Sequence, residues 1–578
     1  MRRKTVLSCA AIALIGAASA FAPPETAFAQ TPLQLRIIGI NDFHGHLEPG
    51  DNAVQVPDPR HPTRTVALRS GGAAYLATRI RELRSDAPHS LVISSGDLIG
   101  ASPFVSGLFY DEPTVAVMNA IGLDVNAVGN HEFDRGVAEL QRIVAGGCRA
   151  ESSGGRISCP GQIPFAGARF PFIAANVTDR DGKALFAPSF VREIDGVRIG
   201  VIGAVTRSTA SIVKQDAVAG LRFAAEAAAL NQTAAELRRQ GVHTLIAVIH
   251  EGGDADGGFN ACDNPRGAIF EIARELDRSI DAVLSAHTHH GYNCRVGGRP
   301  VIQGASFGRL VSVVDLTIDR TSGGAVADRT QSRNVPVPNG LSRDPALAVQ
   351  YPPLAPDPVV AAIVDEYAAR AAPLASRPAG RLAGGFDRTP SAGGDHALGR
   401  LIADAQLAAT RSFGGVIALT NPGGIRANLR PHADASVTCA DVFAVQPFGN
   451  TLVTLSLTGA QLRALLEQQW SARKSERARM LQPSRGLSYA WDPKRPIGAR
   501  VIADSLRLDG QRIESERAYR VTVNDFLALG GDGFTVLRDG TDRSGGPLDV
   551  EAIAAYLRLE SAAQPLAPDR QSRIRRAD

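Results

Sequence analysis

The segment IIGINDFHGHLEP, residues 37–49, carries the pattern on which the fold prediction rests. An apolar, isoleucine-rich run ends at Asn41, and two groups that can bind a cation, Asp42 and His44, follow at once. A short apolar run bounded by polar residues is typical of a buried strand. The segment therefore indicates a strand whose end carries a chemical site.

Four later segments follow the same plan, an apolar run that ends in Asp, Asn or His. They are LVISSG before Asp97, NAVG before Asn130, His131 and Glu132, LIAVI before His250, and AVLSA before His287, Thr288 and His289. In layered α/β folds, sites form where strands end and loops begin, so these side chains can converge. Each segment alone has an ordinary explanation, such as a helix cap, a turn or a core histidine. All five together favour one shared site.

The ligand types indicate the kind of cation. Oxygen and imidazole ligands without sulfur suit Mn, Zn, Fe, Co or Mg, and a carboxylate can bridge two such ions. The sequence has no Cys-x-x-Cys pair, so a thiolate zinc site is not expected. We therefore expect two divalent metal ions as cofactors.

The length of 578 residues predicts two large domains. In the first, expected at 30–335, β-branched runs alternate with Ala- and Leu-rich stretches, which indicates α/β layering with helices that include 72–84 and 223–240. Residues 336–379 are rich in proline and then show helical spacing, which predicts a linker and a connecting helix near 357–374. A second α/β domain is expected at 380–566, followed by a frayed basic tail at 567–578.

Residues 1–29 have the layout of a secretory signal peptide. Arg2, Arg3 and Lys4 precede the apolar run VLSCAAIALIGAASAFA, and small-residue sites follow. We expect cleavage near Ala29, a periplasmic or extracellular protein, and no permanent membrane span, because the run is short for a bilayer. The formal net charge of +4 gives no indication of a nucleic-acid polymer as partner.

Five of the six cysteines remain after the signal peptide is removed, and an odd number in an oxidising compartment suggests two bridges and one thiol. Cys148 with Cys159 would close a short Gly-rich loop. Cys262 with Cys294 would tie two loops that flank motif histidines. Cys439 is then the remaining thiol.

Three loops in the second half suit a nucleotide. The segment TNPGGIR is a Gly-Gly turn whose backbone can approach a ligand closely, beside the cation of Arg426. The segments QPFGN and NDFLALGGDGF place Phe448 and Phe526 in polar, Gly-rich loops, where aromatic rings can stack on a base. Asp532 could accept hydrogen bonds from ribose. Taken singly, the turn is more often ordinary and each Phe more often belongs to a core.

In this order, NDFHG, GD, GNHEFD, a strand-ending His and SAHTH resemble the motifs of calcineurin-like metallophosphoesterases. Their spelling is most similar to the secreted 5′-nucleotidase family, which includes periplasmic UDP-sugar hydrolase and ecto-5′-nucleotidase. NxGGxR, PFG and FLAxGGDGF resemble the C-terminal domain of that family, so the resemblance covers nearly the whole mature chain. It implies an α/β fold with an N-terminal four-layer sandwich, joined by a helix to a C-terminal nucleotide-binding domain. The site would be an interdomain cleft that opens and closes.

The resemblance also implies the roles of the metal-site residues. One metal would be held by Asp42, His44 and His289, the other by Asn130, His250 and His287, with Asp97 bridging them. Some relatives have Gln or Asn at the position of His289, so the metal preference can differ. His131 resembles the catalytic histidine, and Asp134 would orient its ring and favour the imidazolium. The other histidines are interpreted as surface or packing residues: His46, His61, His89, His243, His290, His396 and His432.

For the substrate, the resemblance implies that Phe448 and Phe526 sandwich the base, Asp532 contacts the ribose and Arg426 binds phosphate. Asn421 and Gly424 would line the same pocket. Arg388 is predicted as a further phosphate arginine, with Arg381 and Arg400 as alternatives. Two positions depart from the family: Leu529 stands where Asn or Thr is frequent, and Asp395 where Glu is frequent.

The sequence therefore predicts hydrolysis of nucleoside 5′-monophosphates to nucleoside and phosphate, by in-line attack of a metal-activated water. Nucleoside di- and triphosphates and UDP-sugars are further expected substrates. One alternative is a 2′,3′-cyclic-nucleotide 2′-phosphodiesterase/3′-nucleotidase of the same architecture. Another is a catalytically inactive nucleotide-binding or adhesion protein, which the intact set of metal positions disfavours. Nucleotides are the expected partners, and both a monomer and a homodimer stay open.

Overall fold

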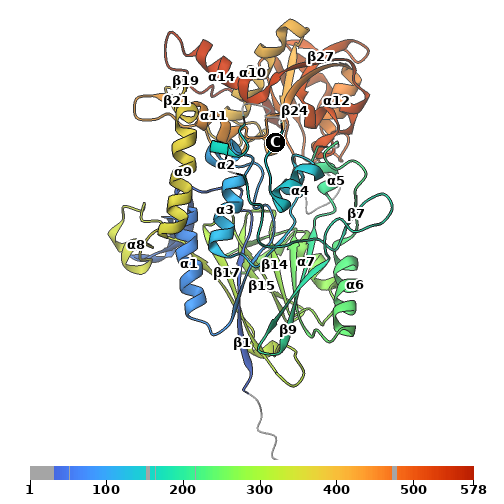
Figure 1. Cartoon of the computed structure of the whole chain (residues 1–578). Coiled ribbons are helices and arrows are strands. Elements are labelled where there is room, and N and C mark those ends of the chain that lie inside the picture. The colour runs from blue at the N-terminus through green and yellow to red at the C-terminus, as the bar shows by residue number, and fades with distance from the viewer. Residues whose placement is uncertain are drawn as a thin grey trace, which may run out of the picture.

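The computed structural model describes residues 31–50, 52–150, 156–162, 164–214, 216–470 and 478–577. The predicted signal peptide and its cleavage point lie outside these residues. Two six-stranded sheets form the N-terminal half, and a smaller α/β unit lies above them (Figure 1). The predicted α/β class is confirmed.

The first sheet has the strand order β18-β17-β1-β4-β5-β6. Strands β1, β4, β5 and β6 run parallel, and β17 and β18 close the other edge antiparallel. The carboxyl ends of β1, β4 and β5 therefore meet at one edge, where three of the five motif loops begin. The bounds are β1 Leu33–Ile40, β4 Ser90–Ser94, β5 Val125–Ala127, β6 Phe172–Ile173, β17 Leu310–Ile318 and β18 Gln331–Pro336.

The second sheet has the order β15-β16-β14-β11-β9-β8, with β9, β11, β14 and β16 parallel. Its strands β11 and β14 carry the other two motif loops at their carboxyl ends. The bounds are β8 Ser189–Ile194, β9 Val197–Val205, β11 Thr244–His250, β14 Ala282–Ser285, β15 Gly291–Val296 and β16 Arg299–Gly304.

The side chains of β1 show how the layers are built. Ile37 packs between the two sheets, whereas Ile38 packs under the helices on the outer face, because successive strand residues point to opposite faces. Helices α1 (Ala73–Ser85), α3 (Glu112–Ile121) and α9 (Pro358–Ala375) cover this outer face, and α6 (Glu226–Arg239) and α7 (Ala268–Glu275) cover the second sheet. The helices predicted at 72–84 and 223–240 correspond to α1 and α6. The arrangement is the predicted four-layer sandwich.

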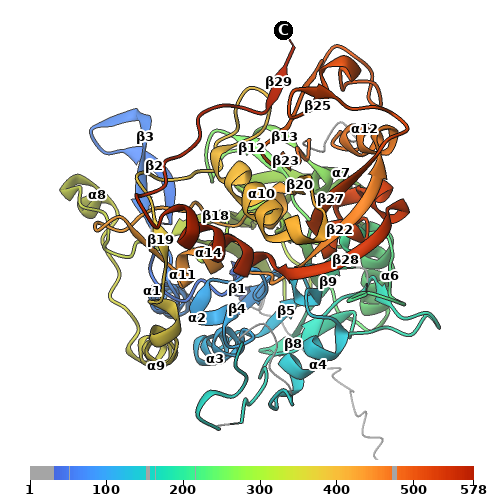
Figure 2. The same cartoon turned by 90° about the horizontal axis from the view of Figure 1, so that it is seen from above.

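The C-terminal half contains a five-stranded sheet and a four-stranded one, flanked by α10, α12 and α14. Figure 2 shows these elements lying over the ends of the N-terminal sheets. The bounds are α10 Ala397–Thr410, β20 Ile417–Thr420, β22 Thr451–Thr458, α12 Gly459–Glu467, β23 Gln482–Pro483, β24 Leu487–Trp491, β25 Arg507–Leu508, β26 Gln511–Arg512, β27 Ala518–Asn524, β28 Thr541–Leu548, α14 Asp549–Glu560 and β29 Ile574–Arg576.

Helix α9 joins the two halves, as predicted for 357–374 (Figure 1). Asp357 caps its start by accepting hydrogen bonds from the amides of Val359 and Val360, and Pro358 occupies its first turn. Its buried residues pack against α1 and α3.

The remaining α-helices and strands of the described residues are β2 Ala53–Asp58, β3 His61–Arg69, α2 Phe104–Gly107, α4 Val137–Ala145, β7 Val177–Thr178, α5 Thr209–Ile212, β10 Arg222–Phe223, β12 Asp254–Asp256, β13 Asp263–Arg266, α8 Pro345–Gln350, β19 Pro378–Arg381, β21 Ser436–Thr438, α11 Cys439–Val445 and α13 Asp525–Ala528.

The prediction of a frayed C-terminal tail is wrong. Arg573 binds both carboxylate oxygens of Asp404 at 2.7 and 2.8 Å, and Ile574 is buried. Strand β29 then pairs parallel with β24. A charged composition suggested a solvated tail, but here one arginine has a partly buried carboxylate partner and one isoleucine fills the core.

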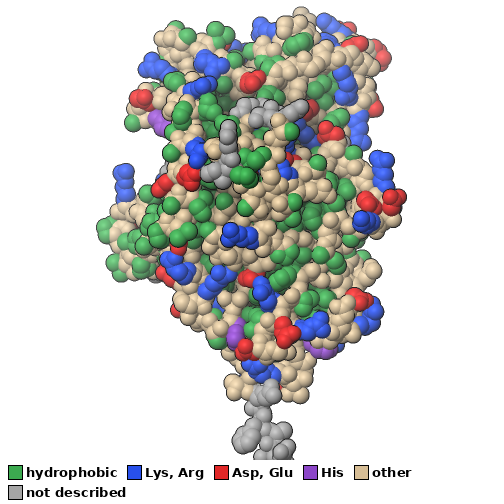
Figure 3. All heavy atoms as spheres, in the orientation of Figure 1, with side chains coloured by type: hydrophobic (Ala, Val, Ile, Leu, Met, Phe, Trp, Pro, Cys, Tyr) green, Lys and Arg blue, Asp and Glu red, His purple; other side chains and the backbone are tan. Residues whose placement is uncertain are grey.

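Two disulfides are present, Cys148–Cys159 and Cys262–Cys294, and Cys439 is a free thiol. Both pairs agree with the predicted pairing. No helix among the described residues has the length and apolarity that a bilayer crossing requires. On the face shown in Figure 3, acidic and basic side chains are scattered among apolar and polar ones.

Candidate functional site

Asp42, His44 and His289 form the first group of potential ligands. Asp42 and His44 follow β1, and His289 follows β14. Nε2 of His289 lies 3.4 Å from Oδ1 of Asp42 and 3.2 Å from Nε2 of His44. The ligand atoms of these three residues lie close enough to share one metal ion.

Asp97, His250 and His287 form a second such group, and Asn130 joins it. The Nε2 atom of His250 lies 3.0 Å from Oδ2 of Asp97 and 3.1 Å from Oδ1 of Asn130. The same Oδ2 atom lies 3.6 Å from Nε2 of His44. Asp97 therefore stands between the two groups, the position that a bridging carboxylate requires.

Backbone carbonyls orient two of the imidazoles. Nδ1 of His44 donates to the carbonyl of Gly100 and Nδ1 of His250 to that of Ser95, both at 2.8 Å. A carbonyl only accepts, so Nδ1 carries the proton and Nε2 is left to face a cation, the arrangement that orients histidine ligands.

The charge states of the histidines fit metal binding with one exception. Burial lowers the pKa of His44 well below its usual value and that of His287 to about 3, so both are neutral near pH 7. Neutral imidazole is the form that binds a metal. Burial alone would also lower the pKa of His250, but the carboxylate of Asp97 outweighs it and raises this pKa to about 10. His250 must therefore lose a proton when a cation binds.

The backbone at these ligands is strained. Five of the seven predicted ligands have positive φ: Asp42 47°, His44 47°, Asp97 51°, His287 74° and His289 61°. Such values are uncommon outside glycine and persist where the surroundings enforce them. For Asp42, His44 and Asp97, the loops after β1 and β4 hold each other in place, because the amides of Asp42 and His44 donate to the carbonyls of Gly96 and Asp97 at 3.0 Å.

Glu132 ties the loops of Asp97 and Asn130 together. Its buried carboxylate accepts hydrogen bonds from the amides of Asp97, Leu98 and Gly129 at 2.8–3.0 Å. Burial, together with the charge of Asp97, raises the pKa of Glu132 to about 8, while these hydrogen bonds oppose the shift. In the sequence, Glu132 stands beside Asn130 and His131, but nothing there predicts these hydrogen bonds.

His131 lies at the boundary between the metal groups and an open cavity. Its Nδ1 atom lies 2.8 Å from Oδ2 of Asp134, and its amide donates to Oδ1 of Asp97 at 2.8 Å. Burial alone would lower the pKa of His131, but the carboxylates of Asp134 and Asp97 outweigh it and the pKa is raised. The two carboxylates thus favour the protonated ring, and an imidazolium at this position is suited to stabilise an anion.

A cavity of about 480 Å³ joins the two halves of the chain. Asn130, His131, Asp134 and His287 line it from the N-terminal half. From the C-terminal half it is lined by the predicted substrate residues Asn421, Gly424, Arg426, Phe448, Phe526 and Asp532. Two sets of residues far apart in sequence thus face one space.

Within this cavity the aromatic and polar groups are already in contact. The Phe448 ring stacks on His131 with centroids 5.7 Å apart, and the Arg426 guanidinium lies 5.9 Å from the centre of the same ring. Nδ2 of Asn421 donates to Oδ2 of Asp532 at 2.7 Å. Burial raises the pKa of Asp532.

The predicted arginines differ in position. Arg388 is not among the residues that line the cavity, and it donates to the carbonyl of Ile425, one residue before Arg426. Arg400 is buried and pairs with Asp395 at 2.9 Å, and Arg381 ends the edge strand β19. A role for Arg388 at the phosphate stays a prediction.

Five cationic residues that line the cavity were not singled out from the sequence: Arg135, Arg149, Arg156, Lys214 and Arg479. Arg135 directly follows the GNHEFD motif, which could have pointed to it. Arg156 follows a Gly/Ser-rich stretch with no periodic pattern, so no local feature of the sequence marks it.

Comparison with known proteins gives two family matches. Residues 35–291 match the calcineurin-like phosphoesterase model, and residues 378–539 match the model described as 5′-nucleotidase, C-terminal domain. The boundaries of both matches lie within the halves described above. The matched ranges contain every predicted metal, catalytic and substrate residue.

Individual proteins match over most of the chain. "Endonuclease YhcR" of Bacillus subtilis (strain 168) is 32% identical over 95% of this chain, which spans 41% of that protein. "Cell wall protein Lmo0130" of Listeria monocytogenes is 29% identical, covering 95% of this chain and 70% of that one. The crystal structure of the 5′-nucleotidase precursor from Thermus thermophilus matches with a TM-score of 0.74 and 25% identity, covering 94% of this chain and 100% of that one.

Proposed function

Because the chain belongs to the family of calcineurin-like phosphoesterases with a 5′-nucleotidase C-terminal domain, we propose that it hydrolyses nucleoside 5′-monophosphates to nucleoside and phosphate. The observation that supports this most is the shared cavity, lined by His131 and His287 on one side and by Phe448 and Phe526 on the other. A ligand whose phosphate lies at the two histidines and whose base lies at the two phenylalanines would be a nucleotide. Nucleoside di- and triphosphates and UDP-sugars are further substrates in this proposal.

The fold implies divalent metals, and the residues present fit them. Asp42, His44 and His289 would hold one ion, and Asn130, His250 and His287 the other, with Asp97 shared. When bound, two such ions acidify a water and neutralise charge on the phosphate. Loss of one shared carboxylate would therefore disturb both positions.

His131 is proposed to stabilise the phosphoryl group. Its Nδ1 proton is directed to Asp134, which leaves Nε2–H free for a phosphoryl or leaving-group oxygen in the cavity. The raised pKa keeps a larger share of the ring protonated near pH 7. Positioned donors of this kind stabilise charge that develops during the reaction.

The substrate residues select a nucleotide in this proposal. Arg426 supplies a cation that can bind phosphate oxygens through two N–H groups. Phe448 and Phe526 present rings to the base, and stacking tolerates different bases because each has a π-face. Asp532 and Asn421 offer acceptors and donors to the ribose.

Export to an oxidising compartment is part of the proposal. The two disulfides suit such a compartment, and the basic, apolar and small-residue pattern before Gln30 is typical of a signal peptide. Detection of the N-terminus of the secreted protein at Gln30 would support export.

Phosphate release from a panel of nucleotides by metal-loaded protein tests the proposed reaction. The expected order places AMP and other 5′-monophosphates first. Faster turnover of 3′-AMP and 2′,3′-cyclic AMP would favour the cyclic phosphodiesterase/3′-nucleotidase alternative. Binding of AMP without phosphate release would favour an inactive binding or adhesion protein. A short oligonucleotide belongs in the panel because one relative is named an endonuclease.

A further inference from the structure

Arg156 connects the two halves of the chain beside the cavity. It lies in the range that matches the phosphoesterase model, yet its Nη2 atom donates to the carbonyl of Pro447 at 2.7 Å and to that of Phe448 at 3.4 Å. Its Nε atom donates to the carbonyl of Gly107 at 3.2 Å. One side chain of the N-terminal half thus holds the backbone of the loop that carries Phe448.

The side chain is buried and bound by neutral groups. Arg156 is 8% exposed, and its guanidinium also lies 5.6 Å from the centre of the Phe443 ring. Among the described residues its hydrogen-bond partners are backbone carbonyls, not carboxylates. Burial lowers its pKa to about 10, so it stays charged at neutral pH. Charge-assisted hydrogen bonds to carbonyls are stronger than neutral ones.

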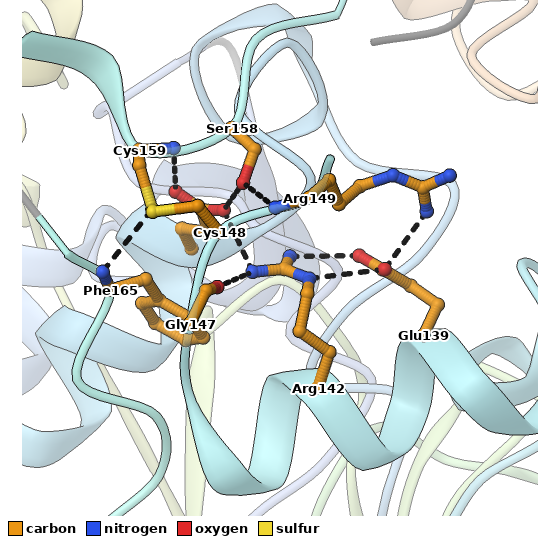
Figure 4. The surroundings of a disulfide bond; sticks show 9 residues. Glu139, Arg142, Gly147, Cys148, Arg149, Ser158, Cys159 and Phe165 are labelled. Carbon is orange, nitrogen blue, oxygen red and sulfur yellow. Dashed lines mark hydrogen bonds and ion pairs between the residues drawn. A yellow bond between two sulfur atoms is a disulfide. The ribbon is translucent and has the colours of Figure 1, made fainter. Parts of the chain in front are cut away.

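A disulfide anchors the segment that presents Arg156 (Figure 4). Cys159 is bonded to Cys148, and its amide donates to Glu112 at 2.8 Å. Ser158 donates to the same carboxylate at 2.6 Å, and Arg142 pairs with it at 2.9 Å. Because the disulfide and these hydrogen bonds tie the segment to the N-terminal half, Arg156 can fix a loop on the opposite half instead of following that loop's motion.

The backbone that Arg156 binds is the backbone that carries the Phe448 ring. Both carbonyls bound by Nη2 belong to the residues immediately around that side chain, and the ring already stacks on His131. A shift of this backbone would move the ring relative to the cavity. We propose that Arg156 is a positioning residue that sets Phe448 for stacking on the base of the substrate. This inference rests on the proposed nucleotide hydrolysis.

The loop that carries Phe526 also has a contact from the N-terminal half, but a weaker one. Lys214 of the N-terminal half pairs with Asp525 at 3.0 Å, one residue before Phe526. The two side chains are 27% and 25% exposed to solvent, and ion pairs with such exposure contribute little to stability. Loss of Lys214 should therefore affect nucleotide binding less than loss of Arg156.

Competitive inhibition by adenosine separates positioning of the base from binding of the phosphate. Adenosine carries no phosphate, so its inhibition constant against an aryl phosphate substrate reports on the contacts of the base and the ribose without those of the phosphate. For Arg156→Gln we expect this constant to rise about tenfold, because charge-assisted hydrogen bonds are lost. The kcat/KM for the aryl phosphate should fall less than about threefold. Arg156→Lys keeps the charge but cannot bridge the carbonyls of Gly107 and Pro447. It should therefore raise the adenosine inhibition constant nearly as much as Arg156→Gln does.

Two controls and a double variant complete the experiment. Arg192→Gln removes an arginine that pairs with Asp124 and does not line the cavity, and it should leave the adenosine constant unchanged. Lys214→Met should raise it less than about threefold. In a Phe448→Ala background, Arg156→Gln should add less than about twofold, because the ring on which it acts is gone.

Two results would overturn the proposal. If Arg156→Gln raises the KM for AMP but leaves adenosine inhibition unchanged, Arg156 binds phosphate directly. If Arg156→Gln weakens adenosine binding and lowers aryl phosphate turnover by the same factor, Arg156 stabilises the fold in general and does not position Phe448. Failure of the proposed function itself looks different: the unsubstituted protein would cleave the aryl phosphate but would neither be inhibited by adenosine nor cleave AMP.

Discussion

Asp97 is the residue on which both groups of potential metal ligands depend. Its Oδ2 atom lies near His250 and His44, while Oδ1 accepts from the amide of His131. Burial would raise the pKa of this carboxyl, but the neighbouring His250 and His131 hold it well below its usual value. It therefore stays an anion in the buried site, where a cation can bind it.

Asp97→Asn tests this role directly. Replacing an anionic oxygen by an amide should remove turnover, with kcat lower by about a thousandfold or more, and should reduce the bound metal together with it. Phosphate release and metal analysis of the purified variant are the measurements. Normal turnover in this variant, or in protein treated with a chelator, would rule out the two-metal centre.

His131→Asn provides the matched contrast. His131 lies within reach of His44 and Asp97 as a third group of potential ligands, but it is predicted to stabilise the phosphoryl group and not to hold a metal. Its loss should therefore lower kcat by about 100- to 10,000-fold. The bound metal should stay at the level of the unsubstituted protein. A variant that loses metal and turnover in parallel would assign His131 to the metal site instead.

The ligand types could be predicted from the sequence, but their conformation could not. Asp42, Asp97 and His250 were found because each follows an apolar run, a local pattern that survives folding. Their positive φ values, such as 51° at Asp97, depend on hydrogen bonds between loops distant in sequence. The contribution of Glu132 has the same origin, since its three partners lie in two separate loops.

At the scale of elements, helix α14 begins at a buried carboxyl. Asp549 is 1% exposed, accepts from the amide of Val550 at 2.8 Å and from Nδ2 of Asn450 at 3.2 Å. Burial outweighs these hydrogen bonds and raises its pKa to about 7. Between about pH 4 and pH 7, the folded protein therefore holds a proton on Asp549 that the unfolded chain has released.

This shift predicts a dependence of stability on pH. Between the unfolded pKa near 4 and the folded pKa of about 7, the folded state binds more protons, so stability falls as pH rises. Asp549→Asn removes this loss of stability. The variant should be more stable than the unsubstituted protein by about 4 kcal/mol at pH 8 and by only about 1–2 kcal/mol at pH 5. Denaturant unfolding at both pH values measures it. A gain of equal size at both would show that the charge of Asp549 is not responsible.

The connecting helix could be predicted from the sequence, whereas the ordered C-terminal tail could not. Helix α9 was predictable because its apolar spacing and its Asp357 and Pro358 start are local features. Strand β29 was not, because its order comes from Arg573 reaching Asp404, which lies 169 residues earlier. Composition alone suggested a solvated tail.

At the scale of the whole molecule, the proposed site draws its residues from both halves. The potential metal ligands follow the strands of the two large sheets, whereas the aromatic rings come from loops of the C-terminal half. Sequence motifs identified both sets, and the fold class followed from the same motifs. The contacts that join the halves, above all Arg156 on the Phe448 loop, carry no motif and became visible only in the structure.

Comparing nucleotide and aryl phosphate turnover in a Phe448→Ala and Phe526→Ala double variant tests the shared cleft most directly. Loss of the stacking rings should raise the KM for AMP by about 10- to 100-fold, because stacking on aromatic side chains stabilises a bound base by about 1–3 kcal/mol. The kcat/KM for an aryl phosphate should change little, since the metal ligands are untouched. Equal losses on both substrates would contradict the assignment of the C-terminal loops to the base, and an unchanged KM for AMP would contradict it outright.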